Sequence, residues 1–185
     1  LRLISHEAGT IRYKGKDISK TEKSFEDSIG VVFDEGFFYD ELTLTQMKNL
    51  IASSYSHWDN GAYTHYLDAF SLRPDQTISS LSRGMKMKFS LALALSHHAE
   101  LLIMDEPTSG LDPLVRMQFI EILKEFMDQG GKAVFYSTHN TSDLDKAADM
   151  LVMIDNGKIL FEEDKDMLLE THRLVKGKGL LPAET

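Results

Sequence analysis

Two adjacent carboxylates follow an apolar run near the middle of the chain. Leu101-Leu102-Ile103-Met104 leads directly into Asp105 and Glu106. A short run without a polar face is typical of an interior strand of a parallel sheet, and ligand sites of open α/β sheets lie just beyond the carboxyl ends of such strands. There, one acid is suited to hold Mg²⁺ and the other to orient or activate a water. The alternative is a strand that merely runs into an acidic turn.

Two other segments carry residues suited to phosphate chemistry. Ser82 stands as an N-cap before a helical run from Met85 to about His98, and Gly84 lets an oxygen-rich ligand approach the backbone. Free N–H groups at a helix start form an anion site, although ordinary capping explains Ser82 equally well. His139 follows an apolar run further on. Taken alone, such a histidine is more commonly structural than catalytic.

Extended and helical segments alternate along the chain, which predicts an α/β fold with a mostly parallel sheet. Residues 42–98 have helical character with little strand signal, which indicates a helical insertion. Its apolar positions include Leu50, Ile51, Tyr55, Tyr66, Phe70 and Leu72. Strands are expected at Thr10–Tyr13, Ile29–Phe33, Leu101–Met104 and Ala133–Tyr136, and a hairpin at Met150–Ile154 and Lys158–Phe161 around Asn156-Gly157.

Two helices are expected after the acidic pair. Pro113 opens one from Leu114 to about Gln129, which Gly130-Gly131 ends, and a short one spans Ser142 to Ala148. The apolar stripe of the first consists of Val115, Phe119, Ile122, Leu123 and Phe126.

Composition narrows the class of protein. The 185 residues suit one domain, and the absence of cysteine excludes a disulfide framework, a thiolate metal site and a cysteine nucleophile. The net charge of -9 argues against a general nucleic-acid binder, which usually has a basic face. No apolar run approaches the roughly 20 residues of a membrane-spanning helix, and no signal-peptide pattern is visible.

The order of the motifs is more specific than any one of them. Leu81-Ser82-Arg83-Gly84 precedes Asp105-Glu106-Pro107-Thr108, Ser109-Gly110-Leu111-Asp112-Pro113 follows, and a later strand ends Ser137-Thr138-His139. In this order the sequence resembles the nucleotide-binding domain of ATP-binding-cassette (ABC) transporters over nearly its whole length. The resemblance implies a P-loop NTPase fold: a RecA-like α/β core with an inserted α-helical subdomain, at about residues 40–98 of a single domain spanning 1–185.

The resemblance also implies roles for individual residues, with ATP and Mg²⁺ as cofactors. Asp105 matches the Walker B aspartate that supports Mg²⁺, Glu106 the acid that polarises the attacking water, and His139 the switch histidine that contacts the γ-phosphate. Residues 109–112, including Asp112, match the D-loop, which reaches across a dimer interface. Residues 81–85 match the signature motif, whose serine and glycine contact the γ-phosphate held by the other protomer.

Three features depart from the family pattern. In the signature, which is usually Leu-Ser-Gly-Gly-Gln, Arg83 and Met85 replace the third and fifth residues. Arg83 supplies a cation able to reach phosphate or to pair across the interface. Asp34 stands where the family commonly has the Q-loop glutamine, and residues 34–39 also fit an acidic turn with an aromatic anchor. No Gly-x-x-x-x-Gly-Lys-Ser/Thr P-loop occurs; because Leu1–Ile4 resembles the end of the helix after that loop, an N-terminal truncation is expected.

The resemblance therefore implies the ATPase subunit of a transporter, peripheral on the cytoplasmic face of the membrane. It would pair head-to-tail with a second nucleotide-binding domain and move separate transmembrane permease subunits, with no nucleic-acid partner. One alternative is a catalytically incomplete nucleotide-binding domain that pairs with an active one, which the missing P-loop favours. Another is a relative acting in DNA repair or translation, which shares the ATP-site motifs but usually has coiled coils or two cassettes.

Overall fold

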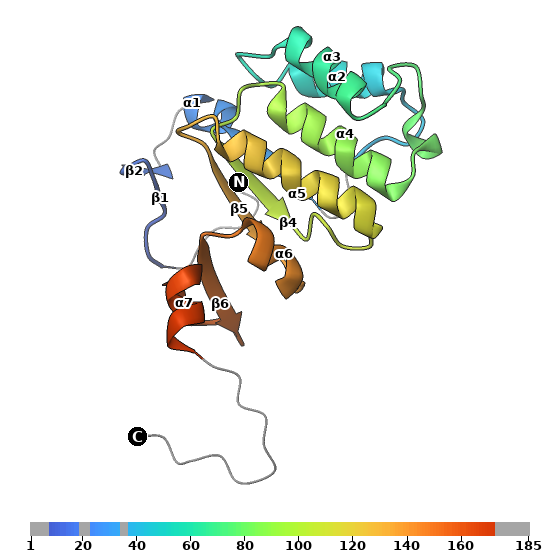
Figure 1. Cartoon of the computed structure of the whole chain (residues 1–185). Helices are drawn as coiled ribbons and strands as arrows, with labels where there is room; N and C mark the ends of the chain where they lie inside the picture. Colours follow the sequence, from blue (N-terminus) through green and yellow to red (C-terminus); the bar gives the residue numbers. More distant parts are fainter. Residues whose placement is uncertain (1–7, 19–22, 34–36, 173–185) are drawn as a thin grey trace. The chain divides into compact units, whose positions relative to one another are not determined.

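The computed structural model describes residues 8–18, 23–33 and 37–172. The chain forms two compact units, Leu1–His139 and Asn140–Thr185. The first unit is the larger and contains helices α1 to α5 (Figure 1).

A parallel sheet in the order β3-β4-β5 forms the centre of the first unit. Its strands are β3 (Ile29–Val32), β4 (Leu101–Asp105) and β5 (Ala133–Ser137). Register pairs Ile29 with Leu101, and Asp105 with Ser137. The predicted interior strand therefore lies between two parallel neighbours, and the last residues of β4 and β5 are adjacent.

A short hairpin precedes the sheet. β1 (Arg12–Tyr13) pairs antiparallel with β2 (Lys16–Asp17) around Lys14-Gly15, which takes positive φ angles of 48° and 77°. Lys14 Nζ lies 2.6 Å from Glu100 Oε2, and the Tyr13 hydroxyl donates to the same oxygen. This pairing ties the hairpin to the residue before β4. A five-residue helix, α1 (Lys23–Asp27), leads into β3.

The region expected to be helical holds α2 (Leu44–Ala52), α3 (Asn60–Ala69), the 3₁₀ helix η2 (Ile78–Ser80) and α4 (Arg83–Leu95). Figure 1 shows α2 and α3 above α4, and both helices contact α4. The N-caps Thr43 and Asp59 accept hydrogen bonds from the backbone N–H groups of Gln46 and Ala62. The helical prediction for residues 42–98 is confirmed, although α4 begins two residues earlier than expected and ends at Leu95.

Leu50, one of the apolar positions of α2, lies outside the core. Leu50 is 52 % exposed, while Leu44 and Met47 of the same helix are buried. Since an α-helix turns about 100° per residue, Leu44, Met47 and the half-buried Ile51 lie within about 60° of one another, whereas Leu50 lies about 120° away from Leu44.

A glycine allows α4 to lie close on the sheet. A Cβ on Gly30 of β3 would lie 2.6 Å from Leu102 Cδ2 and 3.0 Å from Ala94 Cβ, so only hydrogen fits between β3, β4 and α4. Helix α5 (Pro113–Met127) follows β4. Its predicted stripe is confirmed at Phe119, Leu123 and Phe126, with Val115 and Ile122 partly buried and Ile120 as an additional core residue.

The second unit contains α6 (Thr141–Ala147), β6 (Met150–Asp155), β7 (Lys158–Asp164) and α7 (Lys165–Thr171). β6 and β7 form the predicted antiparallel hairpin around Asn156-Gly157, both at positive φ. Helix α7 was not expected; it begins where Asp164 caps the N–H groups of Asp166 and Met167.

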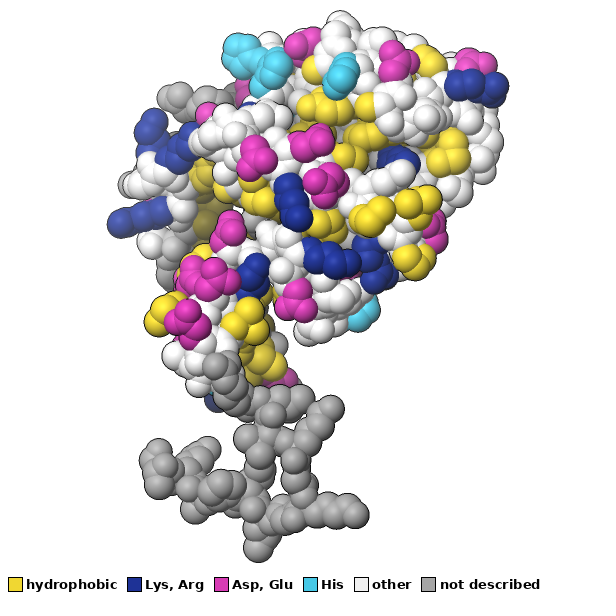
Figure 2. Space-filling model, in the orientation of Figure 1, with side chains coloured by type: hydrophobic (Ala, Val, Ile, Leu, Met, Phe, Trp, Pro, Cys, Tyr) yellow, Lys and Arg dark blue, Asp and Glu magenta, His cyan; other side chains and the backbone are white. Residues whose placement is uncertain are grey.

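Charges of both signs are mixed on the surface. On the face in Figure 2, acidic side chains are interspersed with lysine and arginine. Within the residues that the structure describes, no helix is long and apolar enough to cross a membrane.

Candidate functional site

The carboxyl ends of β4 and β5 bring polar side chains together. Because the parallel register places Ser137 beside Asp105, the Ser137 hydroxyl donates a 2.6 Å hydrogen bond to Asp105 Oδ1. The next backbone N–H, that of Glu106, donates to the Ser137 carbonyl at 3.1 Å and lies 3.4 Å from its hydroxyl oxygen. Ser137 therefore orients both acids, a role that sequence reasoning did not assign to it.

Glu106 takes an uncommon backbone conformation, with φ at +46°. One of its carboxylate oxygens, Oε2, is buried although the side chain as a whole is 27 % exposed. His139 Nδ1 lies 2.8 Å from that oxygen, an ion-pair distance when the ring is protonated. The contact does not have hydrogen-bond geometry, so Glu106 Oε2 accepts no hydrogen bond from the described residues. The Glu106 carboxylate is chemically suited to act as a general base toward a water.

Asp105 is exposed at the carboxyl end of β4. The sheet ends at this residue, so its carboxylate projects beyond the packed strands instead of among them. An exposed carboxylate oriented by a hydroxyl fits Mg²⁺, which usually takes one or two protein carboxylates and fills its other positions with water and phosphate oxygens.

The predicted signature segment begins helix α4. Ser82 is its N-cap, with the hydroxyl accepting from the Met85 N–H at 3.3 Å. Gly84 lies in the first turn, where a Cβ would come within 3.3 Å of Val115 Cγ1 on α5. Both residues therefore have a structural use: Ser82 satisfies a helix-end donor, and Gly84 allows two helices to approach.

Arg83 is directed toward its own chain. A Cβ on Gly110 would lie 2.7 Å from Arg83 Nη1 and 3.0 Å from Arg83 Cζ, so the guanidinium packs directly on this glycine. Asp112, the last residue of the predicted D-loop, caps α5 by accepting from the N–H groups of Leu114 and Val115 at 3.1 Å.

The structure thus joins the predicted site residues in two groups. Asp105, Glu106 and His139 meet at the ends of β4 and β5. Arg83 and Gly84 lie against the D-loop and α5. Asp34, the predicted Q-loop residue, and the predicted helix remnant at residues 1–4 lie outside the described residues.

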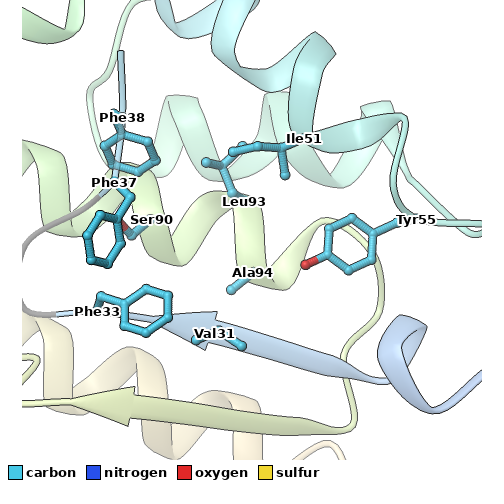
Figure 3. Close-up of a pocket in the computed structure, with 9 residues that line it drawn as sticks. All are labelled: Val31, Phe33, Phe37, Phe38, Ile51, Tyr55, Ser90, Leu93 and Ala94. Carbon is cyan, nitrogen blue, oxygen red and sulfur yellow. The ribbon is translucent and has the colours of Figure 1, made fainter. Parts of the chain in front are cut away.

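An apolar pocket of about 230 Å³ lies between β3 and the helices α2 and α4 (Figure 3). Strand β3, the segment after it, α2 and α4 line it. Phe37 is 80 % exposed and packs edge-to-face on Phe33, while Phe38 contacts Phe89 of α4. Both rings therefore pack against other aromatic side chains. The lining residues are Val31, Phe33, Phe37, Phe38, Ile51, Tyr55, Ser90, Leu93 and Ala94.

Comparisons with known proteins relate the chain to ABC transporters. The family model described as ABC transporter matches residues 1–109. The bacitracin transport ATP-binding protein BcrA of Bacillus licheniformis is 29% identical over 94% of this chain and 57% of its own length. The lantibiotic transport ATP-binding protein SrtF of Streptococcus pyogenes is 29% identical over 89% of this chain and 70% of its own length.

A solved structure described as an ATP-binding subunit of an ABC transporter superposes with a TM-score of 0.76 and 25% identity, covering 89% of this chain and 70% of the other. The chain spans a little over half the length of several curated relatives, BcrA among them. With its parallel sheet, its helical insertion and a family match over more than half of its residues, the chain belongs to the ABC transporter family and has the P-loop NTPase fold of its ATP-binding domains.

Proposed function

We propose that the protein containing this chain is the ATP-hydrolysing subunit of an ABC transporter. The observation that carries the proposal is the arrangement of Asp105, Glu106 and His139 around Ser137 at the ends of β4 and β5. Phosphoryl transfer needs mainly positioning and charge stabilisation. Asp105 supplies a carboxylate for the metal, Glu106 an acceptor for the attacking water's proton, and His139 an imidazole near the transferred phosphoryl group.

In this proposal each residue has a separate task. Asp105 supports Mg²⁺, which neutralises charge on the β- and γ-phosphates when bound. Glu106 polarises the attacking water through its carboxylate. His139 contacts the γ-phosphate. A P-loop is required as well, and the 185 residues contain no P-loop motif; the proposal therefore concerns the complete protein.

The remaining contacts of the proposal involve partners. Ser82 and Gly84 would contact the γ-phosphate held by a second nucleotide-binding domain in a head-to-tail dimer, and Asp112 and Asp34 would serve the D-loop and Q-loop of that assembly. The apolar pocket lined by β3, α2 and α4 would receive an apolar segment of a transmembrane permease subunit at the cytoplasmic face. Its exposed aromatic side chain and mostly apolar lining suit such a partner.

The catalytic assignment is tested by Glu106→Gln in the complete protein. Loss of the carboxylate should lower ATP turnover about 100-fold or more while ATP still binds, because the amide keeps the shape but cannot take up the water's proton. Turnover is measured by phosphate release and binding by a fluorescent ATP analogue. Glu121→Gln, an exposed acid on α5, is the matched control.

The second candidate is a catalytically incomplete domain that pairs with an active one, favoured by the missing P-loop motif. Hydrolysis that is unchanged in Glu106→Gln would remove the catalytic assignment. Failure of the complete parent protein to bind ATP would favour this second candidate.

A further inference from the structure

We propose that Arg83 is a positioning residue that holds the D-loop of its own chain, so that the start of α4 and the loop after Glu106 act as one unit. Its consequence for catalysis rests on the proposed ATPase function; the contact itself does not. Arg83 stands between Ser82 and Gly84, for which a nucleotide contact in a partner is proposed, but its guanidinium is directed onto Gly110.

The geometry is that of a planar group lying on a bare backbone. Three guanidinium atoms of Arg83, Nη1, Cζ and Nε, would lie 2.7, 3.0 and 3.3 Å from a Cβ on Gly110. Gly110 also has φ at +66°, a conformation that side chains rarely adopt. The absence of a side chain therefore serves two purposes here: it permits the left-handed backbone and makes room for the guanidinium.

The residues on both sides of this contact are already anchored. Gly84, next to Arg83, lies against Val115 and Leu111, and Leu111 is buried in the core. Asp112 caps α5. Gly110 is exposed, and the guanidinium of Arg83 covers it from the side on which a side chain would lie.

A backbone hydrogen bond connects this contact to the proposed catalytic acid. The N–H of Ser109, the residue before Gly110, donates to the Glu106 carbonyl at 3.0 Å. Movement of Gly110 therefore acts on the turn that gives Glu106 its left-handed backbone and aims its carboxylate. Misplacement of a catalytic group by about 1 Å can lower a rate about 100-fold.

Arginine suits this place better than lysine. Its guanidinium is flat, delocalised and weakly hydrated, so it can lie face-on against a peptide, whereas the lysine ammonium is a compact and strongly hydrated charge. Arg83→Lys should therefore behave like Arg83→Ala, although the positive charge is kept.

The test compares ATP turnover of Arg83→Ala, Gly110→Ala and the double variant in the complete protein. Each single change should lower kcat about tenfold or more and leave KM for ATP nearly unchanged, because it disturbs positioning rather than ATP binding. If the residues act through one contact, the double variant should show about the same loss as either single variant.

Gly131→Ala is the matched control for the glycine. Gly131 has φ at +68° with no atom within 4 Å of an added Cβ, so its alanine variant bears the same backbone strain without the arginine contact. It should lose about as much thermal stability as Gly110→Ala and retain parental kcat.

Four outcomes would overturn the proposal. Losses that multiply in the double variant would show independent roles, and a raised KM in Arg83→Ala would make Arg83 a nucleotide ligand. Parental kcat in Arg83→Ala would leave Arg83 without a role in positioning.

Amide hydrogen exchange over residues 108–112 tests the contact separately from the activity. Exchange should become faster in Arg83→Ala even where the complete protein hydrolyses no ATP, and unchanged exchange would refute the contact.

Discussion

At the scale of single residues, the site depends on a serine that joins two strand ends. Ser137 donates to Asp105 and accepts from the Glu106 N–H, so one residue of β5 contacts both the last residue of β4 and the acid that follows it. Hydrogen bonds from such neighbours fix the direction of a metal-binding carboxylate and support its affinity.

Ser137→Ala should therefore raise the Mg²⁺ concentration that half-saturates ATP hydrolysis by about tenfold, within the range seen when a metal ligand loses its hydrogen-bond partner. Asp105 keeps its charge but loses the donor that holds it. The measurement is a Mg²⁺ titration of turnover in the complete protein. Ser79→Ala, at an exposed position of η2, should leave the titration unchanged, and an unchanged titration in Ser137→Ala would contradict the orienting role.

At the scale of elements, helical spacing predicted which segments form helices better than which side of each helix is buried. In α2 the sequence contains apolar residues at Leu44, Met47, Leu50 and Ile51. Two overlapping stripes can be drawn through them, and only the position of α4 and the core decides between them. The structure selects the stripe that includes Leu44 and Met47.

The pair Met47→Ala and Leu50→Ala tests this selection. Met47 is buried, so its truncation should lower the free energy of unfolding by about 2–5 kcal/mol. Leu50 is half exposed on the same helix, and its truncation should change that energy by less than about 0.5 kcal/mol. Chemical denaturation of both variants measures the difference; similar losses would mean that α2 is rotated from the face described.

At the scale of the whole molecule, a buried histidine links elements that are far apart in sequence. His97 follows α4, with Nε2 3.1 Å from the Ile29 carbonyl of β3 and Nδ1 3.3 Å from the Leu93 carbonyl. Its ring stacks on Tyr55 at 3.8 Å between centroids. A neutral imidazole has one N–H and can donate to only one of the two carbonyls.

Burial lowers the pKa of His97 below its ordinary value of 6.5, although hydrogen bonds to the two carbonyls act in the opposite direction. The unfolded chain then binds a proton at this residue more readily than the folded one. The contribution of the neutral His97 to the free energy of unfolding should be fully present above about pH 6.5, and it should decline as the pH falls toward the folded-state pKa.

Chemical denaturation from pH 7.5 to 5 measures the slope of the free energy of unfolding against pH. His97→Gln should flatten it, even though the loss of packing lowers stability at every pH. The matched control is His57→Gln at an exposed position, which should retain the parental slope. An equal slope in His97→Gln and the parent protein would refute the assignment.

The sequence by itself determined the order and type of most elements and the place of the acidic pair. These follow from local patterns: the apolar run before Asp105, the glycines after α5, the Asn156-Gly157 turn and the cap at Ser82. It did not reveal α7, whose signal is a single capping aspartate, Asp164.

Contacts between distant residues were decided only by the tertiary structure. Ser137 reaches Asp105 across 32 positions of sequence, and Arg83 reaches Gly110 through the packing of α4 against α5. The residue types at these places are common, and a sequence pattern does not specify which side chain from one element meets which from another. Register and helix packing specify it, because they fix the relative positions of strands and helices that local periodicity leaves free.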